Sequence, residues 1–200
     1  MSEIMGISRL RIDTDGEGVT TLVVFYACPL GCKYCINSQC NKSDTIRTSY
    51  TAEELYDIVS IDDLYFKMTN GGVTFGGGEP LLQSDFIHKF CNLVAGKWKI
   101  RIETSLNVDW RYIENIINDI DEWYIDLKDT NPKIYKQYTG CDNDKVMENY
   151  KKLIDEVGSS KICVRLPEIP DYNTNEDIKK SIELIKDTVD CIDIFKYIRC

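Results

Sequence analysis

Residues 20–40 read TTLVVFYACPLGCKYCINSQC, a stretch that joins a predicted strand to a cysteine-rich loop. Residues 20–27 are mainly β-branched, aliphatic or aromatic, and turn-forming residues follow them, which is typical of a strand buried on both faces. Segments of the same character recur at residues 72–77, 99–104, 123–127, 161–166 and 192–197. The chain therefore contains a series of short buried strands.

Helical segments lie between these strands. Thr51 is the predicted N-cap of a helix at residues 52–60, with Glu54 as its capping-box partner. Other helices are predicted at residues 84–95, 109–120, 131–138, 144–157 and 175–189. Alternating strands and helices predict right-handed βαβ units and a parallel sheet. Six such units are too few for a closed eight-fold barrel, so we expect an α/β fold with a partial, TIM-like (β/α)6 barrel. We expect one domain over residues 1–200, with its site at the C-terminal ends of the strands.

Composition and charge narrow the class of protein. The 200 residues are 43% apolar and 28% charged, which suits a globular domain with a buried core. No segment has the length and apolar character of a signal peptide or a membrane span, so we expect a cytoplasmic protein without a membrane partner. The net charge of −9 is spread over many short acidic stretches. Because no lysine and arginine cluster accompanies it, a nucleic-acid partner is not expected.

The strongest signal lies in the cysteines. The chain has nine, and in a reducing compartment thiols serve more often as metal ligands, catalytic groups or packed side chains than as disulfides. Cys28, Cys32 and Cys35 form a C-x3-C-x2-C set directly after the first strand, with Pro29 and Gly31 as turn residues. Thiolates at this spacing can converge on one iron–sulfur cluster. Zinc is the alternative, although a closed zinc site normally has four ligands.

The cysteine loop resembles the signature of the radical S-adenosylmethionine (SAM) superfamily, including the aromatic Tyr34 before its last cysteine. The segment VTFGGGEPLL, residues 73–82, is similar to the glycine-rich segment that holds the methionine amino group of SAM in that superfamily. Its glycines allow the main chain to approach a ligand closely, and Glu79 can pair with an ammonium group. The resemblance implies a 4Fe–4S cluster, with one iron left open for SAM, because only three thiolates are supplied.

Within this superfamily the sequence is similar to glycyl radical enzyme activating enzymes, of the pyruvate formate-lyase and anaerobic ribonucleotide reductase types. The matching segments are DGEGVTTLVVF (residues 15–25), IETS (102–105), YIDLK (124–128) and VRL (164–166). In chemical terms, a carboxylate can accept from ribose hydroxyls, and lysine or arginine can meet a carboxylate. The resemblance assigns the cluster to Cys28, Cys32 and Cys35, and SAM to Tyr34, Asn37, Gly77, Gly78, Glu79, Glu103, Thr104, Asp126, Lys128 and Arg165.

For some of these residues a purely structural role is an open alternative to a role in binding SAM. Asp126 and Lys128 have the alternative reading of solvated loop charges, whereas Arg165 needs a partner in either reading because it lies in an apolar strand. Glu103 is either a structural carboxylate or, by resemblance, part of a monovalent-cation site. His88, in the middle of a predicted helix, is expected to be a surface or interface residue rather than a ligand. The cysteines without paired spacing are expected to be packed thiols; they are Cys91, Cys141, Cys163 and Cys191. Cys40 and Cys200 are left unassigned.

The sequence also departs from the family pattern. Ile36 stands where the pyruvate formate-lyase type has a histidine, and residues 196–200 contain none. Residues 36–50 are too few for the ferredoxin-like insert of larger activating enzymes, so we expect a single-cluster version. The chain ends near the sixth predicted strand, and we therefore expect a large partner to cover the open side of the barrel.

The resemblance implies a complete reaction. A donor such as flavodoxin or ferredoxin would reduce the cluster, SAM would be cleaved, and hydrogen would be abstracted from a glycine of a glycyl radical enzyme. Two alternatives stay open: a small-molecule radical SAM enzyme similar to 7-carboxy-7-deazaguanine synthase, and a non-catalytic iron–sulfur or zinc module. Glu79, Asp126 and Lys128 disfavour the module, because a plain electron carrier needs no methionine pocket.

Overall fold

A computed structural model describes residues 1–197, which fall into two compact units. The first unit contains Met1–Cys28, Gln39–Glu103 and Trp110–Glu122, and the second contains Pro29–Ser38, Thr104–Asp109 and the described residues from Trp123 onward. The expectation of a single domain stays a prediction. None of the helices in this part of the chain has the length and apolar character that crossing a bilayer requires.

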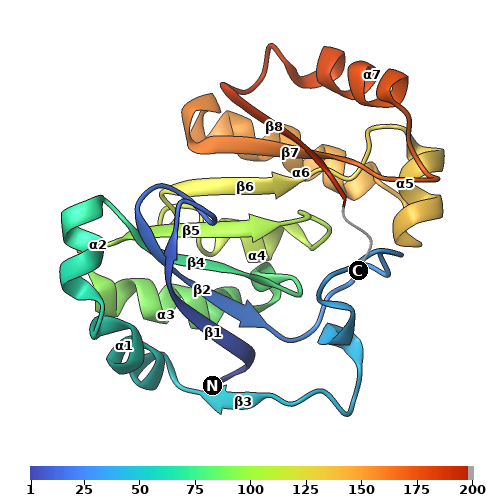
Figure 1. Cartoon of the computed structure of the whole chain (residues 1–200). Helices are drawn as coiled ribbons and strands as arrows, with labels where there is room; N and C mark the ends of the chain where they lie inside the picture. The colour runs from blue at the N-terminus through green and yellow to red at the C-terminus, as the bar shows by residue number, and fades with distance from the viewer. Residues whose placement is uncertain (198–200) are drawn as a thin grey trace. The chain divides into compact units, whose positions relative to one another are not determined.

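The first unit contains five strands in the order β3-β1-β2-β4-β5 (Figure 1). These strands are β1 (Ser2–Ile12), β2 (Val19–Phe25), β3 (Thr48–Tyr50), β4 (Gly72–Gly77) and β5 (Lys99–Thr104). β2, β4 and β5 pair in parallel, as predicted. β1 pairs antiparallel with both β2 and β3, so the sequence analysis missed two strands at this edge.

Helices cover the parallel strands of the first unit, and aromatic side chains fill its core. The helical segments are α1 (Ala52–Ser60), α2 (Asp63–Thr69), α3 (Ser84–Val94), α4 (Trp110–Glu114) and the short 3-10 turns η1 (Ser38–Asn41) and η2 (Pro80–Gln83). Thr51 caps α1 together with Glu54, which confirms the predicted capping box. Phe25 of β2 stacks on Phe75 of β4 with ring centroids 5.7 Å apart, and Phe86 of α3 meets Phe25 edge to face. This packing fixes α3 against the strands that lead to the candidate site.

The second unit contains three parallel strands, β6 (Glu122–Asp126), β7 (Ile162–Glu168) and β8 (Cys191–Lys196). Its helical segments are α5 (Pro132–Thr139), α6 (Asp144–Val157), α7 (Asn175–Ile185) and the 3-10 turn η3 (Ser159–Lys161). In Figure 1, β8 lies beside β7 and follows α7 in the chain. Alternate residues of β7 are buried, whereas every residue of β8 is exposed or half-buried, as expected for an edge strand.

Two sequence-based expectations need correction. Only Trp110–Glu114 of the helix predicted at 109–120 is helical, and a further helix, α2, had no counterpart in the prediction. Cys163 and Cys191 were expected to be packed thiols, but they form a disulfide between β7 and β8. The reason is their register, since the two residues lie directly opposite each other on paired strands. Cys200 lies outside the described residues.

Candidate SAM and iron–sulfur site

In the first unit, residues that follow β2 hold Cys28 and the glycine-rich segment. Ala27 donates its backbone N–H to the carbonyl of Cys40 at 2.8 Å and accepts from the N–H of Glu79 at 2.7 Å. The Asn41 side chain makes two hydrogen bonds to the backbone of Cys28. Its Oδ1 accepts from the Cys28 N–H, and its Nδ2 donates to the Cys28 carbonyl, each at 2.8 Å. Ala27 therefore holds Glu79 by a backbone hydrogen bond and precedes Cys28 directly in the chain, so the positions of Cys28 and Glu79 are fixed relative to each other.

The glycine-rich segment is required by strand packing. Gly77 has a φ of +100°, and a Cβ there would lie 2.8 Å from the backbone nitrogen of Phe25. A Cβ at Gly78 would collide with the carbonyl oxygen of Ala27, and the Gly78 N–H already donates to the carbonyl of Phe25 at 2.9 Å. Only glycine allows β4 to end this close to β2. The sequence-based interpretation gave close approach to a ligand as the reason for these glycines; close approach between strands is the reason that the structure supplies.

Gly78→Ala should therefore lower the free energy of unfolding by about 1–3 kcal/mol, because the new methyl group meets backbone that cannot move independently. Gly6→Ala is the matched control: the position is also in the first unit, and a Cβ there meets nothing within 4 Å. That control should change stability by less than about 0.5 kcal/mol. Urea unfolding of both variants measures the difference. Equal stability of the two variants would contradict the packing argument.

Two carboxylates of the first unit lie at the ends of its parallel strands. Glu79 follows β4, is only 1% exposed, and accepts a hydrogen bond from the N–H of Leu81 at 3.3 Å as the N-cap of η2. Glu103 is the fifth residue of β5, and its Oε2 would lie 3.1 Å from a Cβ at Gly76. Glu103 thus faces the glycine-rich strand. A monovalent-cation role for Glu103 stays a prediction.

In the second unit, the C-terminal end of α5 supports the cysteine loop. The N–H of Gly31 donates to the carbonyl of Thr139 at 2.8 Å, and the N–H of Lys33 donates to the carbonyl of Tyr138 at 3.2 Å. These bonds flank Cys32 and use carbonyls at the end of a helix, where no intrahelical donor is available. The N–H of Cys35 approaches the carbonyl of Cys32 at 3.4 Å, which begins a turn. The loop is therefore anchored on both sides of its middle cysteine.

Three tyrosines pack around Tyr34 of this anchored loop. The ring of Tyr34 contacts those of Tyr172, Tyr138 and Tyr197 at centroid distances of 5.7, 6.2 and 6.5 Å. The Tyr34 hydroxyl also donates to Asp171 at 3.1 Å. Tyr138 is fully buried. Burial is the main reason why the pKa of its hydroxyl is raised, and the neighbouring Tyr197 is the second. The aromatic residue of the cysteine motif thus packs into a cluster drawn from α5, the β7–α7 loop and the end of β8.

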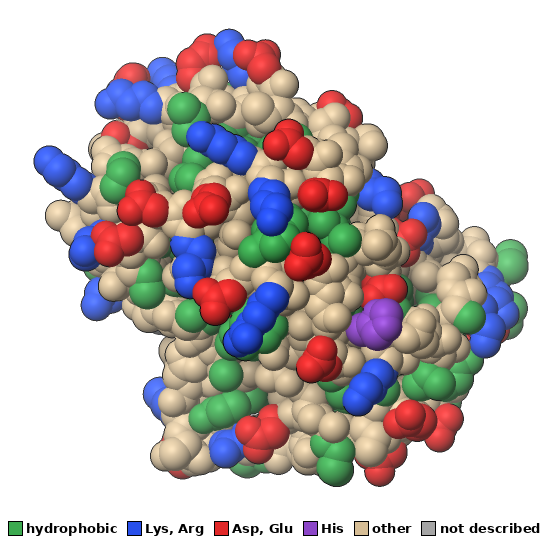
Figure 2. Space-filling view, turned by 180° about the vertical axis from the view of Figure 1, so that it is seen from behind, with side chains coloured by type: hydrophobic (Ala, Val, Ile, Leu, Met, Phe, Trp, Pro, Cys, Tyr) green, Lys and Arg blue, Asp and Glu red, His purple; other side chains and the backbone are tan. Residues whose placement is uncertain are grey.

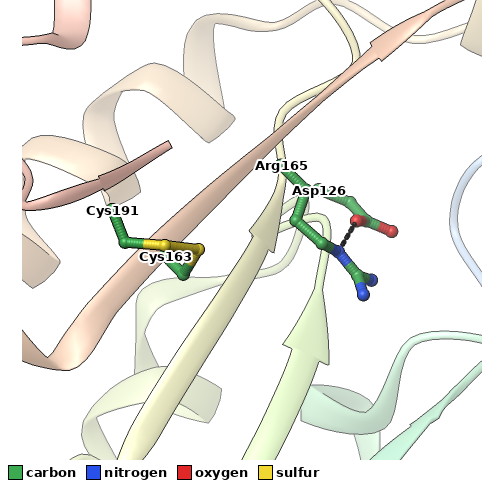
Figure 3. Close-up of a disulfide and its surroundings, with 4 residues drawn as sticks. All are labelled: Asp126, Cys163, Arg165 and Cys191. Carbon is green, nitrogen blue, oxygen red and sulfur yellow. Dashed lines mark hydrogen bonds and ion pairs between the residues drawn. A yellow bond between two sulfur atoms is a disulfide. The ribbon is translucent and has the colours of Figure 1, made fainter. Parts of the chain in front are cut away.

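A charged triad is formed by Asp126 at the end of β6, Lys128 just after it and Arg165 in the middle of β7, and Figure 3 shows Asp126 and Arg165. Asp126 and Arg165 are registered partners on the two strands, and Arg165 Nε donates to Asp126 Oδ1 at 2.7 Å. Lys128 Nζ donates to Asp126 Oδ2 at 3.0 Å. Lys128 is only 8% exposed, so the alternative reading of solvated loop charges is wrong for it. The expected partner of Arg165 is confirmed as Asp126.

The triad keeps its charges at neutral pH. Burial acts to raise the pKa of the Asp126 carboxyl, but Lys128 and Arg165 outweigh burial and lower that pKa to about 2. Burial likewise opposes the charge on Lys128, while Asp126 raises the pKa of the ammonium above its ordinary value. With two cations and one carboxylate, the triad is positively charged overall. Lys128 also lies close enough to Cys32 to oppose the rise in the pKa of its thiol, which burial raises to about 11.

Thr104 plays a local structural part in the second unit. Its hydroxyl accepts from the N–H of Leu106 at 2.9 Å and closes the turn after β5. Asn37 is half-buried in the cysteine loop. Sequence reasoning missed Asn41, because an asparagine thirteen residues beyond Cys28 has no motif spacing. It also missed the buried Asp129, which accepts from the N–H of Asn131 at 2.8 Å and from Asn173 Nδ2 at 3.2 Å.

The remaining cysteines and the histidine agree with structural roles. Cys40 is buried, and burial raises the pKa of the half-buried Cys91 thiol to about 12. Cys141 Sγ lies 3.6 Å from the carbonyl oxygen of Pro29. The side chain of His88 is 47% exposed and its Nδ1 pairs with Asp119 at 2.6 Å, which confirms the expected surface position. Figure 2 shows acidic and basic side chains interspersed on the face that contains this histidine.

The donor set fits an iron–sulfur cluster and SAM in its chemistry. Three thiols stand in one short loop, and the backbone around Cys28 and Cys32 is fixed by hydrogen bonds. A net positive triad suits the carboxylate of SAM, and a buried glutamate suits its ammonium. Residues 1–197 contain no preformed group of three histidine, cysteine or acidic side chains that could hold a metal ion. The assignment of Cys28, Cys32 and Cys35 as ligands therefore stays a prediction.

Comparison with known proteins places this arrangement in a family. Residues 22–190 match the model of the radical SAM superfamily. The chain is 36% identical over 140 residues to the (2S)-3-sulfopropanediol dehydratase activating enzyme of Klebsiella oxytoca, a match that covers 68% of this chain and 43% of that protein. It is 29% identical over 204 residues to the pyruvate formate-lyase-activating enzyme of Clostridium pasteurianum, covering 98% of this chain and 82% of that protein.

Solved structures agree on the fold. Streptococcus suis SuiB bound to S-adenosylmethionine superposes with a TM-score of 0.67 at 16% identity, over 90% of this chain and 42% of SuiB. The chain belongs to the radical SAM superfamily. The prediction of an α/β fold of the partial-barrel type with mainly parallel strands is thereby confirmed. Membership of this family implies a 4Fe–4S cluster and SAM. The chain spans less than half the length of the first of the relatives above.

Proposed function

We propose that this chain is the radical-generating part of an activating enzyme that abstracts hydrogen from a glycine of a glycyl radical enzyme. The main support is similarity to activating enzymes that extends over 68% of the chain in one relative and 98% in another. The charged triad of the second unit and the buried Glu79 of the first add independent support, because a simple electron carrier has no need of a buried lysine or a buried glutamate at these strand ends.

In this proposal each part of the site has a distinct task. Cys28, Cys32 and Cys35 hold the cluster, which when bound supplies one electron to cleave SAM to a 5′-deoxyadenosyl radical that abstracts hydrogen. Glu79 pairs with the ammonium group of SAM, while Lys128 and Arg165 meet its carboxylate. Asp126 orients both cations and accepts from ribose hydroxyls. The tyrosine cluster around Tyr34 keeps water away from the cysteine loop.

The remaining contacts complete the proposed pocket. Gly77, Gly78, Asn37 and Thr104 supply backbone and small polar groups around SAM, and Glu103 would face a monovalent cation. A flavodoxin or a ferredoxin is proposed as the one-electron donor. The glycine would lie in a loop of the partner enzyme, since a radical of this reactivity needs a site closed by the substrate itself.

The test combines a chemical and a spectroscopic readout. The reduced, reconstituted protein should convert SAM to 5′-deoxyadenosine and methionine, and Glu79→Ala should retain iron but lose most of this turnover. Mixing the wild-type protein and SAM with a glycyl radical enzyme from the same genome should give a persistent doublet in electron paramagnetic resonance that needs both proteins. SAM cleavage without any doublet would favour the small-molecule alternative. Neither product nor doublet would favour the non-catalytic module.

A further inference from the structure

A covalent bond outside the cysteine loop joins the last two strands of the second unit. Cys163 is the second residue of β7 and Cys191 is the first residue of β8, and their sulfur atoms are bonded (Figure 3). The two residues are directly paired in the parallel register, with Cα atoms 4.5 Å apart. The bond therefore fastens the start of an edge strand to its neighbour and closes a segment of 28 residues that includes α7.

This disulfide is open to chemical exchange. Cys191 is exposed and Cys163 is half-buried, whereas Cys40 is buried. Thiol–disulfide exchange needs an attacking thiolate to reach one sulfur along the bond axis, so exposure decides which bonds are labile. Cys191 is the more exposed residue of the two, so its sulfur is the expected point of attack. Cys91, whose thiol has a pKa raised to about 12 by burial, provides an unreactive internal standard.

The bond is connected to the candidate site through both strands. Arg165 lies two residues after Cys163 on β7, so their side chains share one face of the strand, and Arg165 holds Asp126 at 2.7 Å. At the other end of β8, the N–H of Tyr197 donates to the carbonyl of Glu168 at 3.0 Å, which continues the pairing with β7. The Tyr197 ring then contacts Tyr34 of the cysteine loop. An edge strand that was free to fray would release this contact first.

We propose that Cys163 and Cys191 are a redox modification site: a reversible dithiol–disulfide couple that fixes β8, and with it Tyr197, when oxidised. Reduction by a dithiol protein of the thioredoxin class would begin with attack on Cys191 Sγ and departure of Cys163 as a thiolate that takes up a proton. The second thiol of the reductant then releases Cys191. Two electrons and two protons reach this chain, and the reductant becomes a disulfide. A low-molecular-weight disulfide reverses both steps.

The experiment follows the couple directly in the reconstituted full chain. The protein is equilibrated anaerobically in buffers of reduced and oxidised dithiothreitol, alkylated, digested and analysed by mass spectrometry. Cys163 and Cys191 should change together between alkylated and mutually linked forms, while the labelling of Cys91 stays constant. Free alkylation of both cysteines at every buffer ratio, or linkage to other cysteines instead, would overturn the proposal.

A second measurement tests the mechanical consequence. Oxidised protein should unfold at a temperature about 5–10 °C above that of reduced protein, because the bond restricts the unfolded chain. Reduction should also increase protease cleavage within residues 186–196. Cys163→Ser/Cys191→Ser should behave like reduced protein in every buffer and keep its iron content, which separates this couple from the cluster cysteines. No difference between oxidised and reduced wild type would refute the fixing of β8, even if the double variant failed to fold.

Discussion

Replacing Cys28, Cys32 or Cys35 with alanine should abolish the iron–sulfur chromophore of the reconstituted protein. Wild-type protein should contain about four iron atoms per chain and show broad absorbance that dithionite bleaches. Three thiolates bind three of the four irons and leave one open for SAM, so the loss of any one removes a required ligand. Iron and sulfide analysis, with the absorbance spectrum near 400 nm, measures the outcome.

Cys91→Ala is the matched control for these variants, since it also removes one thiol but from α3. It should keep the wild-type iron content, with at most a modest loss of stability from the small cavity. Full iron content in any of the three loop variants would remove that cysteine from the ligand set. If wild-type protein bound zinc and never developed the chromophore, the central assignment itself would be wrong.

The sequence predicted the parallel strands well because their local chemistry is unambiguous. GVTFGG and KIRIET are short, β-branched runs bounded by turn residues, and they form β4 and β5 at the predicted bounds. α1 and α6 also match the predicted ranges, since each has a clear amphipathic pattern and α1 has a capping box. In contrast, β1 contains Gly6 and two register irregularities, so it lacks the continuous apolar run of a buried strand.

Other features depend on contacts that local sequence does not contain. Arg101 is fully buried in β5 and pairs with Glu122 at 2.9 Å, although its own segment reads as an ordinary strand. The helix predicted at 109–120 ends at Glu114, because the backbone then changes to tighter i→i−3 turns, with the Ile116 N–H donating to the Ile113 carbonyl at 3.1 Å. The disulfide joins residues 28 positions apart and becomes visible only once the register of β7 and β8 is known.

In the candidate site, too, some features could be predicted from the local sequence and others depend on contacts between distant residues. The identity of its residues could be predicted from motif resemblance, and a partner for Arg165 followed from the cost of an unpaired guanidinium in an apolar strand. The register of β6 and β7 determines that this partner is Asp126. The path of the loop brings Asn41 to the backbone of Cys28. The supporting residues were missed because hydrogen bonds to backbone require no particular spacing in the sequence.

Asp126→Asn should lower the free energy of unfolding by about 1.5–3 kcal/mol, because the amide leaves the buried Lys128 and the half-buried Arg165 without their shared counter-charge. The sign of the pH dependence follows from the lowered pKa of Asp126. Its carboxylate stabilises the fold fully above the ordinary carboxyl range, and this stabilisation is lost as pH falls toward about 2. The deficit of the variant should therefore be constant between about pH 6 and 8 and shrink only below about pH 4.

Asp142→Asn provides the matched control for this change. Asp142 pairs with Lys136 at 2.8 Å, but the two side chains are 65% and 60% exposed, so solvent screens the pair. The control should change stability by no more than about 1 kcal/mol. Urea unfolding of both variants across this pH range, with iron analysis and a SAM-cleavage assay at neutral pH, separates the roles of Asp126. A large loss of stability with iron retained and SAM cleavage abolished is the expected result, because the triad positions two cations that the cofactor also needs. A variant as stable as wild type would show that the triad is dispensable for folding, and unchanged SAM cleavage would remove Asp126 from the proposed pocket.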